Sequence, residues 1–281
     1  IAMETDQLRN NPDQWKVGVS TSLISPLDLK EAKEAGIGCL ELTFQSKTFD
    51  IHDPQTRAAC DEFIGRARAL GIEIWTLHIP YGVPWDPSVA DEREREQVVQ
   101  RVRGVLKIAG EWGIRTAVYH PSWEPIAPEE RRLRMEACKQ TLDILAKEAT
   151  AHRVRLAVEC LPRTWLGNSA EEMAEIVSVN ADLGICCDVN HLFKESPEQF
   201  IRRLGSRIIT THISDNDGND EKHWLPGEGV LDWNGVLGAL SDVGYAGAFL
   251  YETRMVPAAQ VAETWEKLRR LNGAGGAGAD R

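Results

Sequence analysis

The sequence predicts a single α/β domain folded as a (β/α)8 TIM barrel. Short apolar runs alternate along the chain with longer stretches whose apolar residues recur at helical spacing. Eight such pairs follow one another without interruption, and eight parallel strands is the number that closes a barrel. The length of 281 residues suits one barrel, because such domains commonly run to about 250 residues.

The eight expected strands are short and rich in β-branched residues. They are Val17–Thr21, Cys39–Phe44, Glu73–Ile79, Thr116–His120, Arg155–Cys160, Gly184–Asp188, Ile208–Ile213 and Ala248–Glu252. The expected helices cover residues 26–36, 55–70, 89–112, 128–151, 169–180, 197–204, 233–243 and 257–271. Prolines near helix starts and glycines after helix ends support these boundaries. A doubly wound open sheet is the alternative, but no GxGxxG motif follows the first strand.

Residues 17–271 hold this alternating pattern, so we expect the barrel to occupy them. Residues 1–16 are largely polar and are predicted to be a leader or an expression remnant. Residues 272–281 are rich in glycine and are predicted to form a flexible tail.

Composition and charge exclude several classes of function. The net charge of −11 disfavours binding to a nucleic acid backbone. The sequence has no apolar run of the roughly 20 residues that cross a bilayer, and no signal peptide is visible. The six cysteines show no CxxC spacing, which is typical of buried, reduced thiols. We therefore expect a cytoplasmic protein with no nucleic acid or membrane partner.

Four consecutive expected strands, the fifth to the eighth, end in a side chain that can bind a metal ion: Glu159, Asp188, His212 and Glu252. In a TIM barrel, the functional groups come from the C-terminal ends of the strands. One such carboxylate alone is usually a cap or an ion-pair partner. Three carboxylates at one level repel each other unless a cation lies between them. This oxygen-rich set predicts a divalent metal site, with Mn2+ preferred and Mg2+, Co2+ or Zn2+ as alternatives.

Further histidines accompany these strand ends. His78 and His120 lie near the ends of the third and fourth expected strands, and His191 follows Asp188 by three residues. A long polar, Gly-rich loop over residues 212–233 contains His223 and is typical of a binding loop. Its acidic stretch lacks the 12-residue spacing of an EF-hand. A lone histidine is usually a hydrogen-bonded core residue, but these four are predicted to contact a substrate.

Four tryptophans follow strand ends: Trp85, Trp123, Trp165 and Trp224. Their rings could stack on the C–H faces of a sugar or polyol, and simple loop packing explains them equally well. We expect Trp123 and Trp224 to contact the substrate.

These motifs resemble the sugar phosphate isomerase/epimerase family, xylose-isomerase-like barrels that include D-tagatose 3-epimerase, inosose dehydratase and, more remotely, endonuclease IV. The resemblance covers roughly residues 17–270. Its most specific parts are Glu159, Asp188-x-x-His191, His212, the PGEGxxDW stretch at 226–233 and Glu252. The resemblance implies a divalent ion bound by the four strand-end residues, with Glu159 and Glu252 as the acid/base pair. It also implies that His191 contacts the substrate. Ketose epimerases carry an arginine soon after the seventh strand, and residues 214–219 here contain none.

The metal and the paired glutamates predict a divalent-metal-dependent isomerase or epimerase that acts on a small-molecule sugar or polyol ketone through an enediolate intermediate. A dehydratase or other lyase acting on a related keto-sugar or keto-inositol is the alternative, with His191 or His223 as the acid. A non-catalytic barrel that binds a sugar is the third possibility. No strand ends in a Schiff-base lysine and no GxSxG motif is present. A homo-oligomer is compatible with a barrel of this size.

Overall fold

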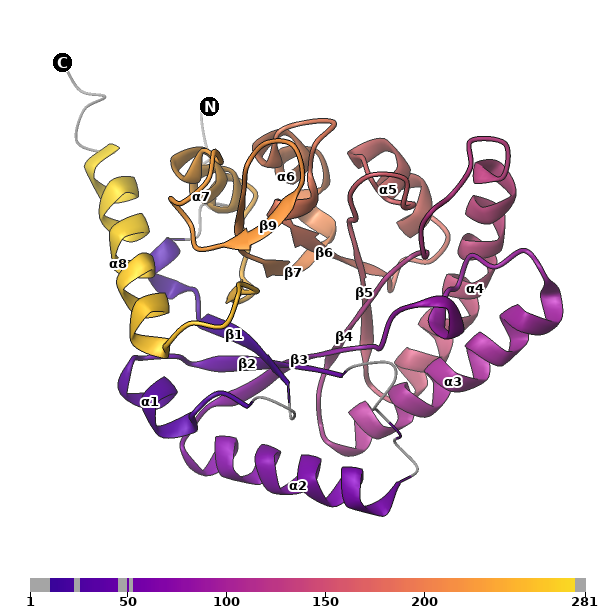
Figure 1. Cartoon of the computed structure of the whole chain (residues 1–281), viewed down its shortest axis with the longest axis horizontal. Helices are drawn as coiled ribbons and strands as arrows, with labels where there is room; N and C mark the ends of the chain where they lie inside the picture. The colour runs from indigo at the N-terminus through magenta and orange to yellow at the C-terminus, as the bar shows by residue number, and fades with distance from the viewer. Residues whose placement is uncertain (1–10, 23–25, 45–49, 51–52, 276–281) are drawn as a thin grey trace, which may run out of the picture.

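The predicted barrel is confirmed by the computed structural model, which describes residues 11–22, 26–44, 50 and 53–275 (Figure 1). Its strands are β1 (Val17–Ser22), β2 (Cys39–Thr43), β3 (Glu73–His78), β4 (Thr116–Tyr119), β5 (Arg155–Glu159), β6 (Gly184–Asp188), β7 (Ile208–His212) and β10 (Phe249–Tyr251). They pair in parallel in the order β10-β1-β2-β3-β4-β5-β6-β7. A parallel bridge between Ile213 and Tyr251 joins the two ends of this sheet.

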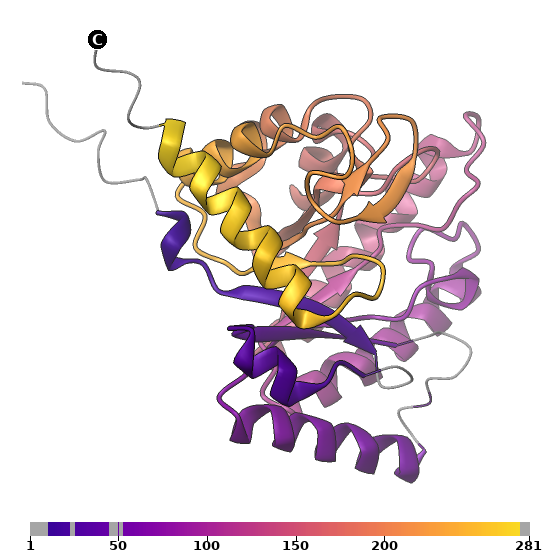
Figure 2. The same ribbon diagram turned by 60° about the vertical axis from the view of Figure 1, so that its left-hand side comes forward.

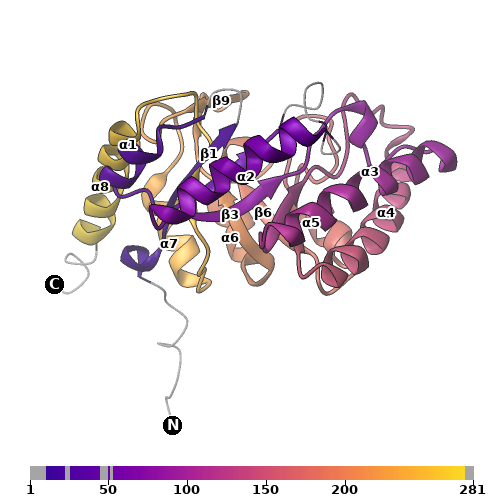
Figure 3. The ribbon, with the colours of Figure 1, turned by 90° about the horizontal axis from the view of Figure 1, so that it is seen from below.

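Helices surround the strands on the outside (Figures 1 and 3). They are α1 (Leu29–Glu34), α2 (Pro54–Ala69), α3 (Glu92–Glu111), α4 (Arg131–Ala151), α5 (Ala170–Val177), α6 (Pro197–Leu204), α7 (Trp233–Asp242) and α8 (Ala258–Gly275). Several begin at a side chain that accepts a backbone N–H of the first turn. Asp53, Asp91 and Asp232 do so for α2, α3 and α7, and Ser196 forms a capping box at α6. These caps explain why the helix starts could be predicted to within a few residues.

The main core lies between the strands and the helices, whereas the interior of the barrel holds smaller clusters. Cys39, Ala248 and Leu250 form one of these, and Val118, Ala157 and Cys186 form another. Because side chains alternate along a strand, Glu41 and Glu159 lie on the same face as Cys39 and Ala157, two residues earlier. Glu41 and Glu159 therefore point into the interior of the barrel, toward its mouth. All six cysteines are unpaired and buried, as expected.

A hairpin within the loop after β7 was not predicted. It consists of β8 (Asp215–Asn216) and β9 (Glu221–Trp224), which pair in antiparallel fashion. Short 3-10 helices also occur at Pro12–Gln14, Val83–Trp85, Val189–His191 and Gly205–Arg207. The hairpin brings the middle of the expected binding loop to the mouth of the barrel.

The two ends of the described chain lie side by side (Figure 2). Trp15, within the predicted leader, is buried, stacks on Phe249 at 5.9 Å and donates its indole N–H to the Tyr245 carbonyl at 2.8 Å. Helix α8 continues to Gly275, beyond its expected end at residue 271. Residues 1–10 of the predicted leader and 276–281 of the predicted tail lie outside the described residues. Among the described helices, none has the length and apolar composition of a membrane span.

Candidate metal centre

The four strand-end residues Glu159, Asp188, His212 and Glu252 meet at the C-terminal mouth of the barrel. Their potential ligand atoms all lie within 4.8 Å of one another. His212 Nδ1 lies 3.4 Å from Glu159 Oε1, 3.7 Å from Asp188 Oδ2 and 3.4 Å from Glu252 Oε2. Glu159, Asp188 and His212 end their strands, and Glu252 immediately follows β10. The convergence expected from the strand ends is therefore present.

Two atoms of this cluster are free to bind a cation. Asp188 Oδ2 and His212 Nδ1 are buried, and neither has a hydrogen-bond partner among the described residues. Buried polar atoms are rarely left unpaired in native proteins. Three carboxylates around one imidazole also concentrate negative charge where water is excluded, which a divalent ion would offset. The donor set of three oxygens and one nitrogen suits a divalent metal ion.

Glu41 holds the imidazole of His212 from the other side. His212 Nε2 lies 3.0 and 3.1 Å from the two oxygens of Glu41, and the Thr76 hydroxyl donates to Glu41 at 2.7 Å. A proton on Nε2 leaves Nδ1 free to face the cluster, an orientation that metal-binding histidines commonly show. Glu41 was not predicted to have a role. In the sequence, Glu41 stands out as the one charged residue of the strand CLELT.

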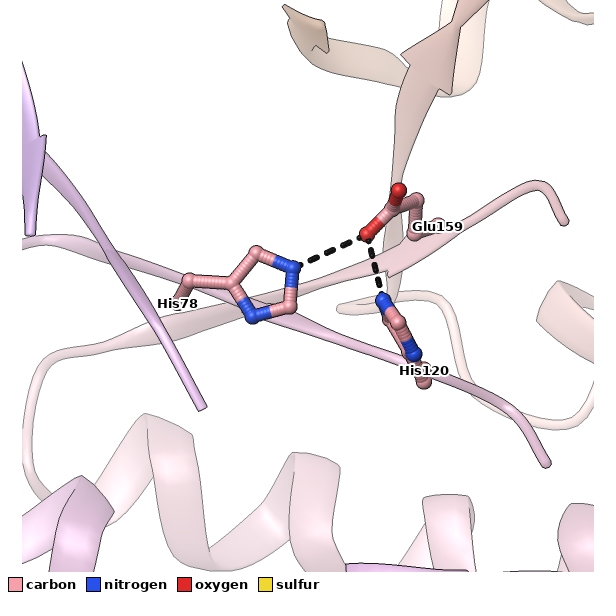
Figure 4. Close-up of side chains that lie close together, drawn as sticks. All are labelled: His78, His120 and Glu159. Atoms are coloured by element: carbon pink, nitrogen blue, oxygen red, sulfur yellow. Dashed lines mark hydrogen bonds and ion pairs between the residues drawn. The ribbon is translucent and has the colours of Figure 1, made fainter. Parts of the chain in front are cut away.

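His78 and His120 both face one oxygen of Glu159 (Figure 4). Their Nε2 atoms lie 3.0 and 3.1 Å from Glu159 Oε2. His78 Nδ1 contacts the Ile79 carbonyl at 2.8 Å. His78 is buried and His120 nearly so, with 11% of its side chain exposed. The two predicted substrate contacts therefore lie beside the metal cluster and share one of its ligands.

His191 and His223 meet at Glu221 of the hairpin, a residue that was not predicted to have a role. His191 Nε2 lies 2.8 Å and His223 Nε2 3.3 Å from Glu221 Oε2. His223 has a φ of 50°, an uncommon backbone conformation for a residue other than glycine. Arg163, from the loop after β5, pairs with the other oxygen of Glu221 at 2.8 Å. The hairpin is thus fixed to the barrel through Glu221.

The two glutamates expected to act as acid and base differ in their proton affinity. Burial opposes the charged form of Glu159, but His120 and His212 outweigh it and hold the pKa of this carboxyl well below its usual range. Burial raises the pKa of Glu252 to about 7, against the attraction of His212. In the metal-free protein, the carboxyl of Glu159 therefore stays ionised near neutral pH, while that of Glu252 can carry a proton there.

A cavity of about 300 Å³ opens above the cluster, and Glu159, Glu252 and the four histidines just described line it. Aromatic rings form one wall. Tyr81 stacks on His120 with ring centroids 4.9 Å apart, and Trp123 meets the edge of Trp165 at 4.9 Å. Trp123, a predicted substrate contact, lines this cavity. Trp224 lies on β9 and is not among the described residues that line it. The volume and the mixed lining suit a small polar ligand.

Asp215 of β8 organises the PGEGxxDW stretch that follows the hairpin. Its buried carboxylate accepts the Gly227 N–H at 2.8 Å and the indole N–H of Trp233 at 2.9 Å. It also accepts the backbone N–H groups of Asn216 and Leu231. The Gly227 N–H therefore donates within the loop. Through these bonds the PGEGxxDW stretch stabilises the hairpin that carries Glu221 and His223.

Several curated proteins are similar to part of this chain. An uncharacterized protein, MJ1311, of Methanocaldococcus jannaschii is 28% identical over 189 residues, which cover 64% of each chain. An inosose isomerase of Bacillus subtilis is 25% identical over 171 residues, covering 56% of this chain and 60% of that one. L-ribulose-5-phosphate 3-epimerase UlaE of Escherichia coli O157:H7 is 26% identical over 191 residues, covering 64% and 66%. The chain thus spans less than two thirds of the length of each of these relatives.

Solved structures share the fold over nearly the whole chain. A D-tagatose 3-epimerase-like protein superposes with a TM-score of 0.79 at 24% identity, covering 92% of this chain and 99% of the other. D-psicose 3-epimerase of Clostridium cellulolyticum H10 does so with a TM-score of 0.72 at 20% identity, covering 93% and 97%. Residues 29–271 match the family described as xylose isomerase-like TIM barrel. The chain therefore belongs to the xylose isomerase-like TIM barrel family.

Proposed function

We propose that this protein is a divalent-metal-dependent isomerase or epimerase that acts on a sugar or polyol ketone through an enediolate. One observation carries the proposal: Glu159 and Glu252 belong to a cluster suited to a divalent ion, and both line one cavity. The names of the relatives, an inosose isomerase and a ribulose-phosphate 3-epimerase, support the same reaction class. A match to the family and fold supports it further.

In the proposed reaction, Glu159, Asp188, His212 and Glu252 hold the ion, and Mn2+ is the one we propose. When bound, such an ion polarises a carbonyl and stabilises the negative charge that develops next to it. One of the two glutamates, Glu159 or Glu252, takes the proton from the carbon beside the carbonyl. The other glutamate returns a proton to the opposite face or to the neighbouring carbon. His191 faces the same cavity and contacts a substrate hydroxyl.

The aromatic wall provides the apolar side of the substrate site. Trp123 and Trp165, whose rings meet edge to face, line the cavity together with the histidines and carboxylates. A sugar or polyol has both surfaces, because its C–H groups can pack on rings while its hydroxyls meet polar atoms. The cavity therefore suits this substrate class in shape and in chemistry.

The proposal is tested by solvent deuterium exchange with the Mn2+-loaded protein, across a panel of ketoses and keto-inositols. We expect deuterium to enter a substrate carbon with no loss of water. Glu252→Gln should slow exchange by about 10²- to 10⁴-fold, the usual contribution of a proton-transfer group. Glu266→Gln, which removes an exposed charge paired with Arg269 on helix α8, is the control and should exchange at the wild-type rate. Absence of exchange with every compound would refute the proposal.

A dehydratase or lyase acting on a related keto-sugar or keto-inositol is the second candidate, and the position of His223 favours it. This ring lines the cavity and lies 3.9 Å from Glu252 Oε2, where an acid could protonate a leaving hydroxyl. An unsaturated product that absorbs in the ultraviolet would identify this reaction. His223→Ala should then abolish its formation, and unchanged turnover in that variant would remove His223 from the mechanism.

A further inference from the structure

A second cavity opens beside the cavity described above, at the C-terminal ends of β1, β2 and β10. Its volume is about 320 Å³, so each of the two cavities has the size of a small-molecule pocket by itself. His78, Tyr81 and Glu252 line both cavities, which therefore adjoin at these residues. The second cavity alone is lined by apolar and by hydroxyl-bearing side chains, among them Val19, Leu27, Phe44, Val256, Val261, Ser20, Thr43 and Thr253.

The first of the two cavities is the one that suits the reacting ketone. Glu159, His120 and His191 are among the described residues that line it, and they do not line the second cavity. Because the proposed reaction uses Glu159 together with Glu252, the carbon atoms that exchange protons lie in the first cavity. A substituent of the same substrate that passes Glu252 and Tyr81 enters the second cavity.

Three hydroxyls of the second cavity donate their protons within the protein. The acceptors are Glu41 Oε1 at 3.3 Å for Ser20, the Thr21 carbonyl at 3.3 Å for Thr43, and the Arg254 carbonyl at 3.0 Å for Thr253. Since carboxylate and carbonyl oxygens only accept, each hydroxyl has used its single proton and presents lone pairs to a ligand. Such lone pairs accept the O–H groups of a sugar and repel the oxygens of a phosphate.

The charges in the second cavity also favour an uncharged occupant. Among its described lining residues, Arg254 carries the only guanidinium or ammonium group. Both terminal nitrogens of Arg254 donate to the carboxylate of Glu228, at 2.6 and 2.7 Å. A phosphate would compete with Glu228 for this guanidinium and would lie near the carboxylate of Glu252. A neutral substituent avoids both costs.

We propose that the substrate is a sugar ketone that carries a second, uncharged sugar unit. The ketone lies in the first cavity and the second unit lies in the second. This inference rests on the isomerase or epimerase reaction proposed above and names its substrate class. The apolar side chains of the second cavity pack on the C–H groups of the second unit, and Ser20, Thr43 and Thr253 accept its hydroxyl protons.

Matched compounds test this proposal with the Mn2+-loaded protein. The four D-ketohexoses that differ only at C3 and C4 are each prepared free, with a phosphate on O6, and with a glucosyl group on O6. Solvent deuterium exchange gives kcat/KM for each compound. We expect the glucosyl form of at least one ketose to exceed both its free and its phosphorylated form by about tenfold or more.

Each other result has a distinct meaning. If every free ketose exchanges as well as its glucosyl form, the second sugar unit is wrong and the proposed reaction stands. If the phosphorylated forms exchange best, the occupant of the second cavity is charged, which overturns this inference and again leaves the reaction in place. Exchange in none of the compounds would contradict the proposed reaction itself and this inference with it.

Variants of the second cavity assign the second unit to it. Val256→Trp fills the cavity and should lower kcat/KM for the glucosyl ketose relative to the free ketose by about tenfold or more. Thr43→Val removes one hydroxyl at nearly constant size and should lower this ratio by about two- to tenfold, the usual contribution of a hydrogen bond. Val230→Trp is the matched control, since Val230 is 64% exposed and is not among the described residues that line either cavity.

The control should keep the wild-type ratio, and circular dichroism verifies the fold of each variant. Thr43→Val decides the question if Val256→Trp does not fold. If the correctly folded variants of Val256 and Thr43 keep the wild-type ratio, the second unit does not lie in the second cavity and the proposal is wrong.

Discussion

At the scale of single residues, the position of His212 depends on a partner that is not itself a ligand. Glu41 contacts Nε2 of this ring through both carboxylate oxygens and is itself held by Thr76. Without this contact, the ring could rotate or change tautomer, and Nδ1 would no longer be fixed toward Glu159 and Asp188. Such outer partners typically contribute 10- to 100-fold to metal affinity.

We therefore expect Glu41→Gln to weaken binding of Mn2+ by about tenfold or more, since the amide keeps the size of the side chain and loses the charge. Titration calorimetry of Mn2+ into the metal-free protein measures this affinity. Glu73→Gln on the neighbouring strand is the control, because Glu73 is half exposed and pairs with Lys16 at the surface. Equal affinities in Glu41→Gln and the wild type would show that His212 needs no partner.

At the scale of elements, the β8–β9 hairpin determines which residues of the long loop reach the cavity. Its pairing carries Glu221 and His223 inward, and Arg163 links Glu221 to the loop after β5. Asp215, in β8 of the hairpin, ties it to the following loop by accepting four N–H groups, those of Asn216, Gly227, Leu231 and Trp233. The hairpin is therefore stabilised by one buried carboxylate.

Replacement of that carboxylate should destabilise the whole molecule. We expect Asp215→Ala to lower the free energy of unfolding by about 3 kcal/mol, because buried donors left without an acceptor cost about 1–3 kcal/mol each and part of the loss is relaxed by water. Asp217→Ala on the same hairpin should change it by less than about 0.5 kcal/mol, since its bonds to Asn219 and Asp220 lie near the surface. Urea unfolding of both variants measures the difference, and equal effects would contradict this role of Asp215.

At the scale of the whole molecule, the barrel concentrates charge at one end. Glu159, Asp188 and Glu252 come from three different strands and face a common centre. In the metal-free protein their mutual repulsion opposes the fold. Binding of an ion to the native state alone stabilises that state, by about 2.7 kcal/mol at 100 times the dissociation constant.

Removal of the metal should therefore lower the melting temperature. For a domain of this size, such a loss of stability corresponds to a shift of roughly 5 °C. Calorimetry with Mn2+ and with excess chelator measures it. Asp188→Asn removes one ligand charge, so the chelator should shift its melting temperature by much less. An equal shift in both proteins would mean that the effect does not arise at this cluster.

The sequence was sufficient for the barrel and for part of the site. Uninterrupted strand–helix alternation determines the fold, and the C-terminal ends of parallel strands meet at one edge, so four residues could be brought together without a structure. Glu221 could not be singled out, because it is one of several acids in its loop. Asp215, Asp217 and Asp220 have the same local chemistry, and only the long-range contacts of the hairpin decide which is buried.

The seam of the barrel lies between two of the proposed ligands. Strands β7 and β10 stand at the two ends of the pairing order, and the Ile213 and Glu252 N–H groups join them by hydrogen bonds of 2.8 and 3.1 Å to the Leu250 and Ile213 carbonyls. His212 precedes this seam on one side and Glu252 lies on the other. An ion bound by both residues would cross-link β7 and β10, the two ends of the pairing order. Metal loading should therefore slow amide hydrogen exchange at Ile213 and Glu252. The closure of the barrel between β7 and β10 would then depend on the same ion as the proposed reaction.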